Sequence, residues 1–561
     1  MPSGHKNMKL RKTLTVTALV LAALAGLAYT NRTYLLLHAM GWGNAVFKPL
    51  LPNQPVPWQA GPAAASQPLA ARPPNIIVIL ADDMGINDVT THGGGYAALG
   101  VPTPAIDSIA RDGVRFDAGY AGSAICTVSR AALMTGRYPW RFGVEFTPTP
   151  GAMAKLLPVL GNNPNQLYPL IIDKQKAAAS RDFEDLGMPA SEITMAETLR
   201  TQGYHTMHIG KWHLGQSNEM RPNNQGFDES LNMEGLLYWQ QDDTNILNSK
   251  QEFDPIDQFL WANGRAAVSF NNGKHFKPAR YLTDYFTDEA VNAIRQNRNR
   301  PFFLYLAHWG VHTPLQAVRA DFDAVDNKAD HRRRVYAGMV RSVDRSVARV
   351  LETLREQGLE ENTIVVFTSD NGAPGYIGLP EVNKPYRGGK LTFFEGGIRV
   401  PFVAKWPGHI PAGTRYAQPV SNIDLLPTVA AAAGAKLPPD RTIDGVNLLP
   451  HLAANPTPQA SRALFWRAGP YRAMRDDNWK LIVAGRPKKE WLFHLADDPT
   501  EQRNLAAQEP QRLASMKAKL EAHHAGMPPP LWESFLEGPV FIDKTLDQKV
   551  TPEDEYTYWV N

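Results

Sequence analysis

Two stretches of the chain are apolar at almost every position and have the length of a buried β-strand. They are residues 76–80 (IIVIL) and 363–368 (TIVVFT), and both are rich in β-branched side chains. Strands that are apolar on both faces are typical of the centre of a parallel sheet that helices cover on each side. The pattern therefore predicts an α/β fold with a large, mostly parallel central sheet.

Helical periodicity alternates with these strands. It is clearest over residues 331–357, where one face carries Tyr and Val side chains at three- and four-residue steps and the other carries Arg and Glu. We expect one main domain over residues 75–458 and a small antiparallel C-terminal subdomain with a tail over residues 459–561. The second expectation rests on short strand-like stretches at 463–467, 471–474, 480–483 and 491–494.

The N-terminal pattern indicates export. Residues 13–28 carry no charge and are mostly apolar, and they follow four Lys and Arg residues between positions 6 and 12. Such a run serves as a signal peptide or as an uncleaved membrane anchor. The small-residue sequence GLA at 26–28 would suit cleavage, so a cleaved signal over residues 1–28 is favoured over a retained anchor. Either outcome predicts a periplasmic or extracellular location.

A Pro- and Ala-rich stretch precedes the first strand. Residues 51–74 (LPNQPVPWQAGPAAASQPLAARPP) have the composition of a solvated spacer. We therefore expect residues 29–74 to be a linker.

Composition excludes some partners and sites. The formal net charge of +3 comes without a long basic run or an aromatic-interleaved basic patch, which argues against a nucleic-acid partner. The only cysteine is Cys126, so the chain has no intrachain disulfide framework and no zinc site with several Cys ligands. No cysteine follows the apolar run, which excludes a lipoprotein.

Oxygen-bearing side chains follow both central strands. Asp82 and Asp83 come directly after the first, and Asp370 and Asn371 after the second. Ligands of open α/β sheets bind beyond the carboxyl ends of the strands, so these four side chains are expected to converge. An all-oxygen set suits Ca²⁺ or Mg²⁺. Either pair alone is also ordinary turn chemistry.

A second candidate site lies in the stretch 126–137 (CTVSRAALMTGR). If a helix begins at Cys126, Arg130 lies one turn further along the same face. The helix N-terminus adds partial positive charge. This arrangement would suit an anionic substrate group.

Taken in order, these motifs resemble the type I sulfatase family of the alkaline phosphatase superfamily. The pattern Cys-x-x-Ser-Arg followed by Thr-Gly-Arg looks like the formylglycine motif of that family, and the resemblance covers about residues 75–506. The further matching stretches are NIIVILADD, TPAIDSIARDGVRF, IGKWHLG, HTP, SDNG, GKLTFFEGGIRVP and WLFHLADDPTEQRNLA. The resemblance implies the alkaline-phosphatase-like fold and hydrolysis of a sulfate ester, borne by an aryl group or a glycan.

The resemblance also implies a cofactor and a modified residue. Cys126 would be oxidised to formylglycine, whose hydrate presents two hydroxyls on one carbon, so a maturation enzyme is an implied partner. Ca²⁺ would be the metal, with Mg²⁺ less favoured. Its ligands would be Asp82, Asp83, Cys126, Asp370 and Asn371.

Family roles carry over to the remaining polar residues. Arg130 and Lys211 would hold the modified side chain and the sulfate, and Asp370 would help to deprotonate the attacking hydroxyl. His213 would take the second hydroxyl proton so that sulfate leaves by elimination. His312 would be the acid for the departing alcohol, and Lys390 would contact the sulfate.

The spacing of two of these residues carries a structural expectation. Lys211 and His213 are separated by one residue in a presumed strand, so their side chains should share a face, with Trp212 on the other. His308 is expected to be structural, because Gly310 and Pro314 argue against a helix that would join it to the histidine four residues later.

Two departures from the family pattern matter. Val128 stands where the motif normally has proline or, less often, alanine, which bears on conversion of Cys126. Residues 145–185 are extra sequence. Together with residues 239–242 (WQQD), they either select the substrate or serve as structural padding.

Two other functions stay open at this stage. A phosphomonoester or phosphonate-ester hydrolase of the same superfamily would use the same sheet and metal ligands, although a two-zinc phosphatase needs further Asp and His ligands that the sequence does not show. A homologue that lacks formylglycine would only bind sulfated glycans. Retention of every polar site residue argues against this second reading.

Overall fold

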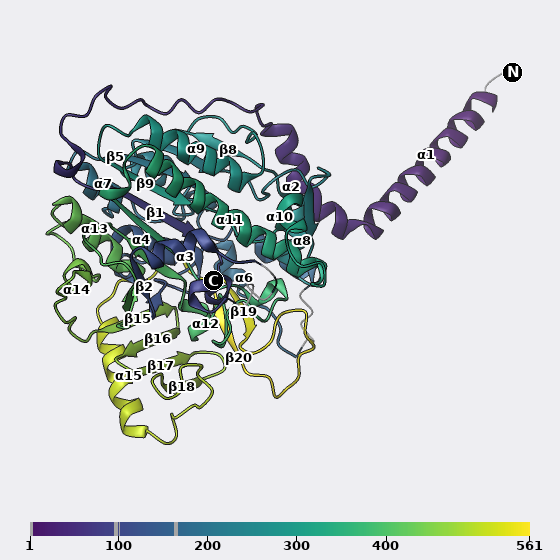
Figure 1. The fold of residues 1–561 in the computed structure, drawn as a ribbon. Helices are drawn as coiled ribbons and strands as arrows, with labels where there is room; N and C mark the ends of the chain where they lie inside the picture. Colours follow the sequence, from purple (N-terminus) through teal and green to yellow (C-terminus); the bar gives the residue numbers. More distant parts are fainter. Residues whose placement is uncertain (1–3, 95–98, 100, 162–166) are drawn as a thin grey trace.

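The computed structural model describes residues 4–94, 99, 101–161 and 167–561. At its centre (Figure 1) is a sheet of nine strands. Their order is β13-β2-β12-β11-β1-β9-β5-β6-β8. Strands β11, β1, β9, β5 and β6 are mutually parallel, whereas β12 and β8 run antiparallel to their neighbours β11 and β6. The strands span Thr414–Tyr416, Val114–Phe116, Phe402–Lys405, Thr363–Ser369, Asn75–Ala81, Phe302–Ala307, His205–Gly210, Glu229–Met233 and Val268–Phe270, in sheet order.

Helices cover both faces of this sheet, as the apolar strands predicted. In β1, Ile76 and Val78 face a core that includes α4 (Cys126–Thr135), α7 (Met195–Arg200) and α13 (Leu425–Ala433). The alternate side chains, such as Ile77, face a second core built with α3 (Pro104–Arg111), α9 (Leu282–Gln296) and α11 (His331–Glu356). The predicted α/β class and the long amphipathic helix are confirmed.

The C-terminal part contains the predicted antiparallel sheet. Its four strands are in sequence order, with α15 (Pro510–His524) packed on β16 and β17. A separate sheet joins β4 (Ile171–Ile172) to β19 (Leu536–Phe541) and β20 (Tyr556–Val560), so the extra stretch 145–185 pairs with the C-terminal tail. Residues 162–166 of that stretch lie outside the described residues. The four strands of the C-terminal antiparallel sheet are β15 (Ala463–Ala468), β16 (Tyr471–Asp476), β17 (Trp479–Ala484) and β18 (Lys489–His494).

Shorter elements complete the fold. They are β3 (Gly119–Tyr120), β14 (Val420–Ser421), β7 (Ile246–Ser249), β10 (Leu315–Val318), α5 (Met153–Leu160), α6 (Lys174–Ala178), α8 (Pro255–Asn263), α10 (Arg319–Asp323), α12 (Glu395–Ile398) and α14 (Leu449–Leu452).

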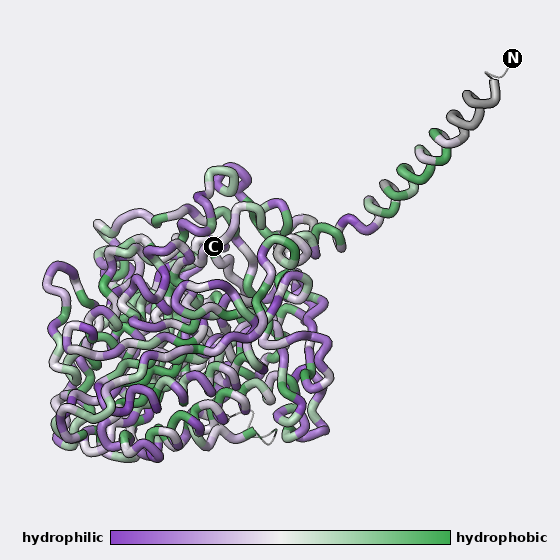
Figure 2. The backbone as a smooth tube through the Cα atoms, turned by 90° about the horizontal axis from the view of Figure 1, so that it is seen from above, coloured by the Kyte–Doolittle hydropathy of each residue, from purple (hydrophilic) through white to green (hydrophobic). Residues whose placement is uncertain are grey.

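Two helices precede the folded body. The first, α1 (Gly4–Thr30), projects away from it, and α2 (Arg32–Phe47) lies against it (Figures 1 and 2). The segment Thr13–Thr30 has a mean hydropathy of 1.8, so it is long and apolar enough to cross a membrane, and none of its side chains that the structure describes is buried. A signal sequence meets the same criterion.

Residues 51–74, expected to be a solvated linker, are mostly exposed but contact the body at several points. This stretch has little regular structure, yet it is bound along the body. Leu51 exchanges backbone hydrogen bonds with His275 and Lys277, each 3.0 Å long. Trp58 is buried, and its indole nitrogen donates to Glu289 Oε2 at 2.8 Å. One large aromatic side chain among the prolines is enough to dock the segment, because it buries a large apolar area.

Candidate functional site

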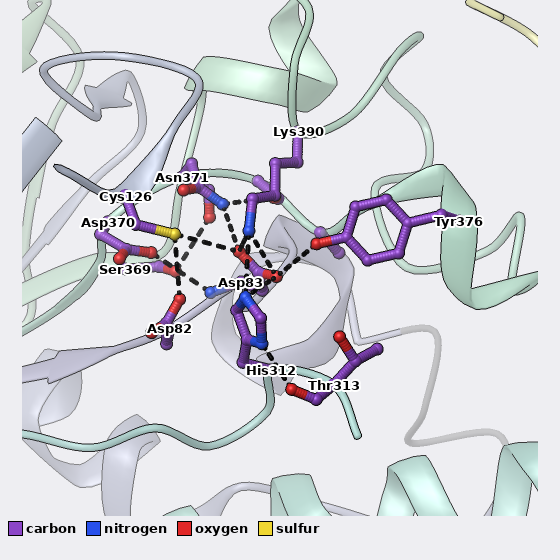
Figure 3. A network of polar contacts seen from close by, with 12 residues as sticks. Asp82, Asp83, Cys126, His312, Thr313, Ser369, Asp370, Asn371, Tyr376 and Lys390 are labelled. Carbon is purple, nitrogen blue, oxygen red and sulfur yellow. Dashed lines mark hydrogen bonds and ion pairs between the residues drawn. The ribbon is translucent and has the colours of Figure 1, made fainter. Parts of the chain in front are cut away.

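The site lies at the carboxyl ends of β1 and β11. The two strands are parallel and paired in register up to Ala81 and Ser369, so Asp82 and Asp370 leave neighbouring strands at the same edge. Both carboxylates are buried, as are Asp83 and Asn371, and all four side chains lie close together (Figure 3). The sequence-based expectation that these side chains converge is confirmed by their positions.

The first turn of α4 brings Cys126 to the same place. Its preceding residue, Ile125, is extended, so the helix begins at Cys126 itself. The thiol sulfur lies 3.3 Å from Asp82 Oδ1 and 3.9 Å from Asp83 Oδ1. One turn later, Arg130 donates from Nε to Asp370 Oδ2 at 2.9 Å and from a terminal nitrogen to Asp82 Oδ2 at 3.1 Å.

Two lysines complete the balance of charge. Lys211, which follows β5, places Nζ 2.5 Å from Asp82 Oδ2. Lys390 places Nζ 2.8 Å from Asp83 Oδ1 and 3.3 Å from His312 Nε2. Three buried acids thus face three cations, which offsets the repulsion among the carboxylates.

The expectation that Lys211 and His213 lie in a strand was wrong, although both side chains lie at the site and Trp212 packs in the core on the other side. Strand β5 ends at Gly210, whose φ is 116°, and His213 has a φ of 61°, so the chain turns immediately after the strand. His213 still lies close enough to interact electrostatically with Asp82 and Lys211. The indole nitrogen of Trp212 donates to the Met220 carbonyl at 2.8 Å.

The pKa values of the two strand-end acids Asp82 and Asp370 are shifted in opposite directions. Burial opposes ionisation of Asp82, but Lys211 and Arg130 outweigh it and hold its pKa well below the usual range. Burial and the neighbouring Asp82 raise the pKa of Asp370 to about 6. Burial, reinforced by Asp370, also raises the pKa of the Cys126 thiol, which is therefore a protonated and weakly reactive group at neutral pH.

The two site histidines are neutral in this environment. Burial lowers the pKa of His312 to about 4. Its Nδ1 donates to the Thr313 carbonyl at 2.6 Å, which leaves the lone pair on Nε2 facing Lys390. Burial and the charge of Lys211 lower the pKa of His213 well below its ordinary value. Among the described residues, Nδ1 of His213 has no hydrogen-bond partner.

The donor set fits a hard divalent cation. Asp82, Asp83, Cys126 and His312 each offer a ligand atom, and these atoms all lie within 4.8 Å of one another. The buried Oδ1 of Asn371 accepts no hydrogen bond from the part of the chain that is described, while its Nδ2 donates to Asp83 Oδ1 at 2.7 Å. The carboxylate and amide oxygens of this cluster are donors that suit a hard cation such as Ca²⁺ or Mg²⁺.

Sequence reasoning missed one polar residue of the site. The hydroxyl of Tyr376 donates to Asp83 Oδ2 at 3.3 Å and borders the cluster (Figure 3). Tyr376 stands in a short 3₁₀ turn five residues after Asn371, within no recognised motif, and only the fold brings it to the site.

Two further positions considered in the sequence are His308 and the stretch 239–242. His308 is buried and contacts Ser346 Oγ at 2.8 Å, as expected of a structural residue. The stretch 239–242 directly follows Tyr238, whose hydroxyl donates to the His312 carbonyl at 2.8 Å.

Comparison with known families identifies related sequences. The family model described as Sulfatase matches residues 74–435. A second, described as N-sulphoglucosamine sulphohydrolase, C-terminal, matches residues 389–525. N-acetylgalactosamine-6-sulfatase of Homo sapiens is 35% identical over 387 residues, which are 68% of this chain and 66% of the human protein, just under two thirds of its length. Steryl-sulfatase of Homo sapiens is 33% identical over 469 residues, covering 70% of this chain and 71% of that protein.

Solved structures similar to this chain include a further relative and a more distant protein with the same fold. The crystal structure of Ps i-CgsB in complex with k-i-k-neocarrahexaose has a TM-score of 0.68 and 32% identity, over 82% of this chain and 95% of that chain. Phosphonate monoester hydrolase of Agrobacterium radiobacter, with a TM-score of 0.54 and 19% identity over 81% of this chain and 96% of its own, shares the fold.

Proposed function

The chain belongs to the sulfatase family, and from this premise we propose that it hydrolyses a sulfate ester, carried by a carbohydrate, to an alcohol and inorganic sulfate. The observation that carries the proposal is the buried cluster in which Cys126 lies between the strand-end acids and three cations. The carbohydrate is favoured over a simple aryl group because Ps i-CgsB, which is similar to 82% of this chain, is solved with an oligosaccharide ligand.

Positive side chains would bind the sulfate. Lys211 and Lys390 each hold an ammonium group within 3 Å of a site carboxylate, so both are fixed at the site before substrate arrives. Arg130 is fully buried and held by two acids, which keeps its guanidinium in one orientation. Fixed charges of this kind stabilise negative charge that develops in a transition state without reorganising.

Proton transfer would be divided among three residues. Asp370, whose carboxylate is bound by Arg130, would take a proton from the nucleophile at Cys126. His312 reaches the cluster with Nε2, 3.5 Å from Asp83 Oδ2; the negative charge of a bound sulfate would raise its pKa, so that the protonated ring would act, beside Lys390, as the acid on the oxygen of the departing alcohol. His213 is neutral with an unused Nδ1, which suits a base that helps to release sulfate.

Two further components would complete the site. Ca²⁺ would be held by Asp82, Asp83, Asn371, the modified Cys126 and Asp370, and when bound it supplies positive charge for the sulfate oxygens. Formylglycine, formed from Cys126 by a maturation enzyme, supplies a hydroxyl nucleophile that the buried, protonated thiol does not offer.

Phosphate and phosphonate esters are the competing substrates. The fold alone does not separate the reactions, since phosphonate monoester hydrolase shares it. Two observations favour sulfate. The cluster of possible metal ligands found among the described residues has four His, Cys and Asp members, whereas two zinc ions with three protein ligands each need about six. The solved relatives above 25% identity also include PsFucS1 sulfatase from Pseudoalteromonas sp., with a TM-score of 0.61 and 26% identity over 82% of this chain and 91% of that chain.

Parallel assays test the proposal. The full-length enzyme would be given 4-nitrophenyl sulfate, 4-nitrophenyl phosphate and a sulfated neocarrahexaose, with inorganic sulfate and phosphate measured by ion chromatography. We expect sulfate release from the aryl and the carbohydrate ester and at least about tenfold lower kcat/KM on the phosphate. Faster turnover of the phosphate would replace the proposal by its competitor. Binding of the oligosaccharide without release of sulfate would identify a non-catalytic binding protein.

A further inference from the structure

Helix α2 carries an apolar stripe that faces away from the folded body. Leu35, Ala39, Trp42 and Val46 recur at steps of four, three and four residues, so at 100° per residue they fall in one narrow sector of the helix. Ala39 is exposed, and Leu35, Trp42 and Val46 expose 37%, 49% and 71% of their surface. Phe47, at the end of the helix, exposes 83%.

The opposite side of α2 is fixed to the body. The amide of Gly41 donates to Asn263 Oδ1 at 2.6 Å, and Asn263 Nδ2 donates to the Leu37 carbonyl at 2.6 Å. Asn263 is the last residue of α8, which packs along α2. The helix is therefore not free to rotate its apolar stripe inward, because both backbone contacts would be lost.

The chain that follows α2 is bound to the folded body at several points. Leu51 is bound beside Phe276, Trp58 is buried, and the amide of Gly61 donates to the Gln296 carbonyl at 2.9 Å. A tethered enzyme would need a loose spacer here. The segment after α2 is instead bound to the body, so α2 keeps one orientation relative to the catalytic centre.

The chain that precedes α2 is the apolar helix α1. Only Asn31 separates the two helices, and the segment Thr13–Thr30 could cross a membrane. The helical backbone continues through residues 26–28, because the Asn31 amide donates to the Leu27 carbonyl at 3.0 Å and Thr30 Oγ1 to the Gly26 carbonyl at 3.0 Å. Signal peptidases cleave extended backbone, so this geometry disfavours cleavage there.

We propose that α1 is retained and that the exposed stripe of α2 lies in the lipid–water interface of the leaflet on the side of the enzyme body. The occupant of the stripe is phospholipid, because the stripe begins five residues after the end of the segment that could span the bilayer and is continuous with it along the chain. Trp and Tyr are favoured at this depth, and α2 exposes both in Trp42 and Tyr34.

The basic residues before the apolar segment determine the orientation of α1 in the membrane. The Lys and Arg residues at positions 6–12 precede the span and would stay in the cytoplasm. The body then faces the periplasm or the exterior. The catalytic centre would be held at a set distance and angle from the membrane, which would direct the enzyme to substrate near the cell surface.

Depth-dependent fluorescence quenching tests this arrangement. The full-length chain carrying Val46→Cys would be labelled with an environment-sensitive fluorophore and reconstituted in phosphatidylcholine–phosphatidylglycerol vesicles, with and without nitroxide-labelled lipid. The native Cys126 is buried, so labelling is confined to the new site. Gln508→Cys, at an exposed position at the start of the α15 region, is the matched control, and Leu35→Cys replaces the first variant if it does not fold.

The two sites should give opposite results. We expect nitroxide lipid to quench the label at position 46 by roughly half or more, and iodide in the water to quench it weakly, as for a helix buried 5–10 Å into the interface. The label at 508 should respond only to iodide. Three results would overturn the proposal: quenching by iodide at both sites, protection of position 46 from both quenchers, which indicates a protein cover, or an intact mass that lacks α1. None of these depends on sulfatase activity.

Discussion

Asp82 and Asp370 lie side by side at the ends of neighbouring strands, yet their pKa values move in opposite directions. Lys211 and Arg130 hold Asp82 ionised, whereas burial and Asp82 itself favour the proton on Asp370. A bound divalent cation would remove this asymmetry by neutralising both carboxylates. We therefore expect a bound metal to lower the pKa of Asp370.

Loss of one strand-end acid should remove the metal. We expect Asp83→Ala, like Asp82→Ala and Asp370→Asn, to abolish turnover and to lower calcium well below the one equivalent per chain of the wild type, as measured by atomic emission. Chelation of the wild type should act likewise. Asp112→Ala, in an exposed ion pair, is the control and should keep its calcium. Full turnover by chelated, metal-free enzyme would refute the metal assignment.

His312 and His213 should fail in different ways. An acid matters most when the departing oxygen is basic, so His312→Ala should slow aryl sulfates with poor leaving groups by about 10²–10⁴-fold and those with good leaving groups much less. With His213→Ala we expect a burst of alcohol followed by slow release of sulfate. A series of substituted aryl sulfates and rapid-quench kinetics separate the two. Equal losses for all esters, with alcohol and sulfate released together, would contradict this division of roles.

Most site residues were predictable because each stands in a motif with a fixed place in the fold. The strand-end pairs and the Cys126–Arg130 helix needed only periodicity and the rule that ligands bind beyond strand ends. The position of His213 was not predictable by the same means, because a left-handed backbone conformation after Gly210 replaces the expected strand. Tyr376 was missed because its contact with Asp83 spans 293 residues.

At the scale of elements, the turn after β1 contains a buried acid that the mechanism does not use. Asp88 caps a short 3₁₀ helix, accepts from the Gly85 amide at 2.8 Å and from the Tyr336 hydroxyl at 2.7 Å, and is fully buried. Burial raises its pKa to about 8. Because an unfolded Asp titrates near about 4, the folded chain binds the extra proton between these values, and stability falls as pH rises through that window.

Asp88→Asn should remove this pH dependence. The amide keeps the acceptor and cannot ionise, so we expect the variant to be about 1–3 kcal/mol more stable than the wild type at pH 8, with a much smaller difference at pH 4.5. Urea unfolding at both pH values measures this. Asp112→Asn should change neither value by more than about 0.5 kcal/mol. A variant less stable than the wild type at pH 8 would show that Asp88 is ionised in the fold.

Elements with a strong apolar pattern were predictable and those formed by distant pairing were not. The amphipathic pattern over 331–357 became α11, which ends at Glu356, and the four C-terminal strands lie within two residues of expectation. Strands β4 and β19 have weak patterns of their own, and their pairing joins residues more than 360 positions apart. Only the three-dimensional structure shows that the stretch 145–185 serves as a partner for the tail.

At the scale of the whole molecule, a buried ion cluster joins the main domain to the C-terminal sheet. Lys480 of β17 contacts Glu395 of α12 and Glu501, each at 2.8 Å, and all three side chains are fully buried. The two carboxylates share one ammonium group. Burial opposes ionisation of both, but Lys480 and Arg399 lower the pKa of Glu395 to about 2, whereas burial raises that of Glu501 to about 7.

Lys480→Met should therefore weaken the whole fold. Removing the cation leaves Glu501 without its charge partner and Glu395 with Arg399 alone, and we expect a loss of about 3–5 kcal/mol in the free energy of unfolding. Lys517→Met, which breaks an exposed pair with Glu490, should cost less than about 1 kcal/mol. Chemical unfolding of both variants provides the comparison. Equal effects would mean that the cluster does not couple the two parts.

The central claim is that sulfate ester hydrolysis depends on formylglycine at Cys126. Val128 lacks the fixed φ with which proline would hold this motif extended for the maturation enzyme, so conversion in a foreign host should be partial. The most direct measurement is mass spectrometry of the peptide containing Cys126, alongside sulfate release per milligram, for the wild type, Val128→Pro and Cys126→Ala. We expect activity to rise in proportion to the converted fraction, to be highest in Val128→Pro and to be absent in Cys126→Ala. Full activity in a preparation whose Cys126 is unconverted would contradict it.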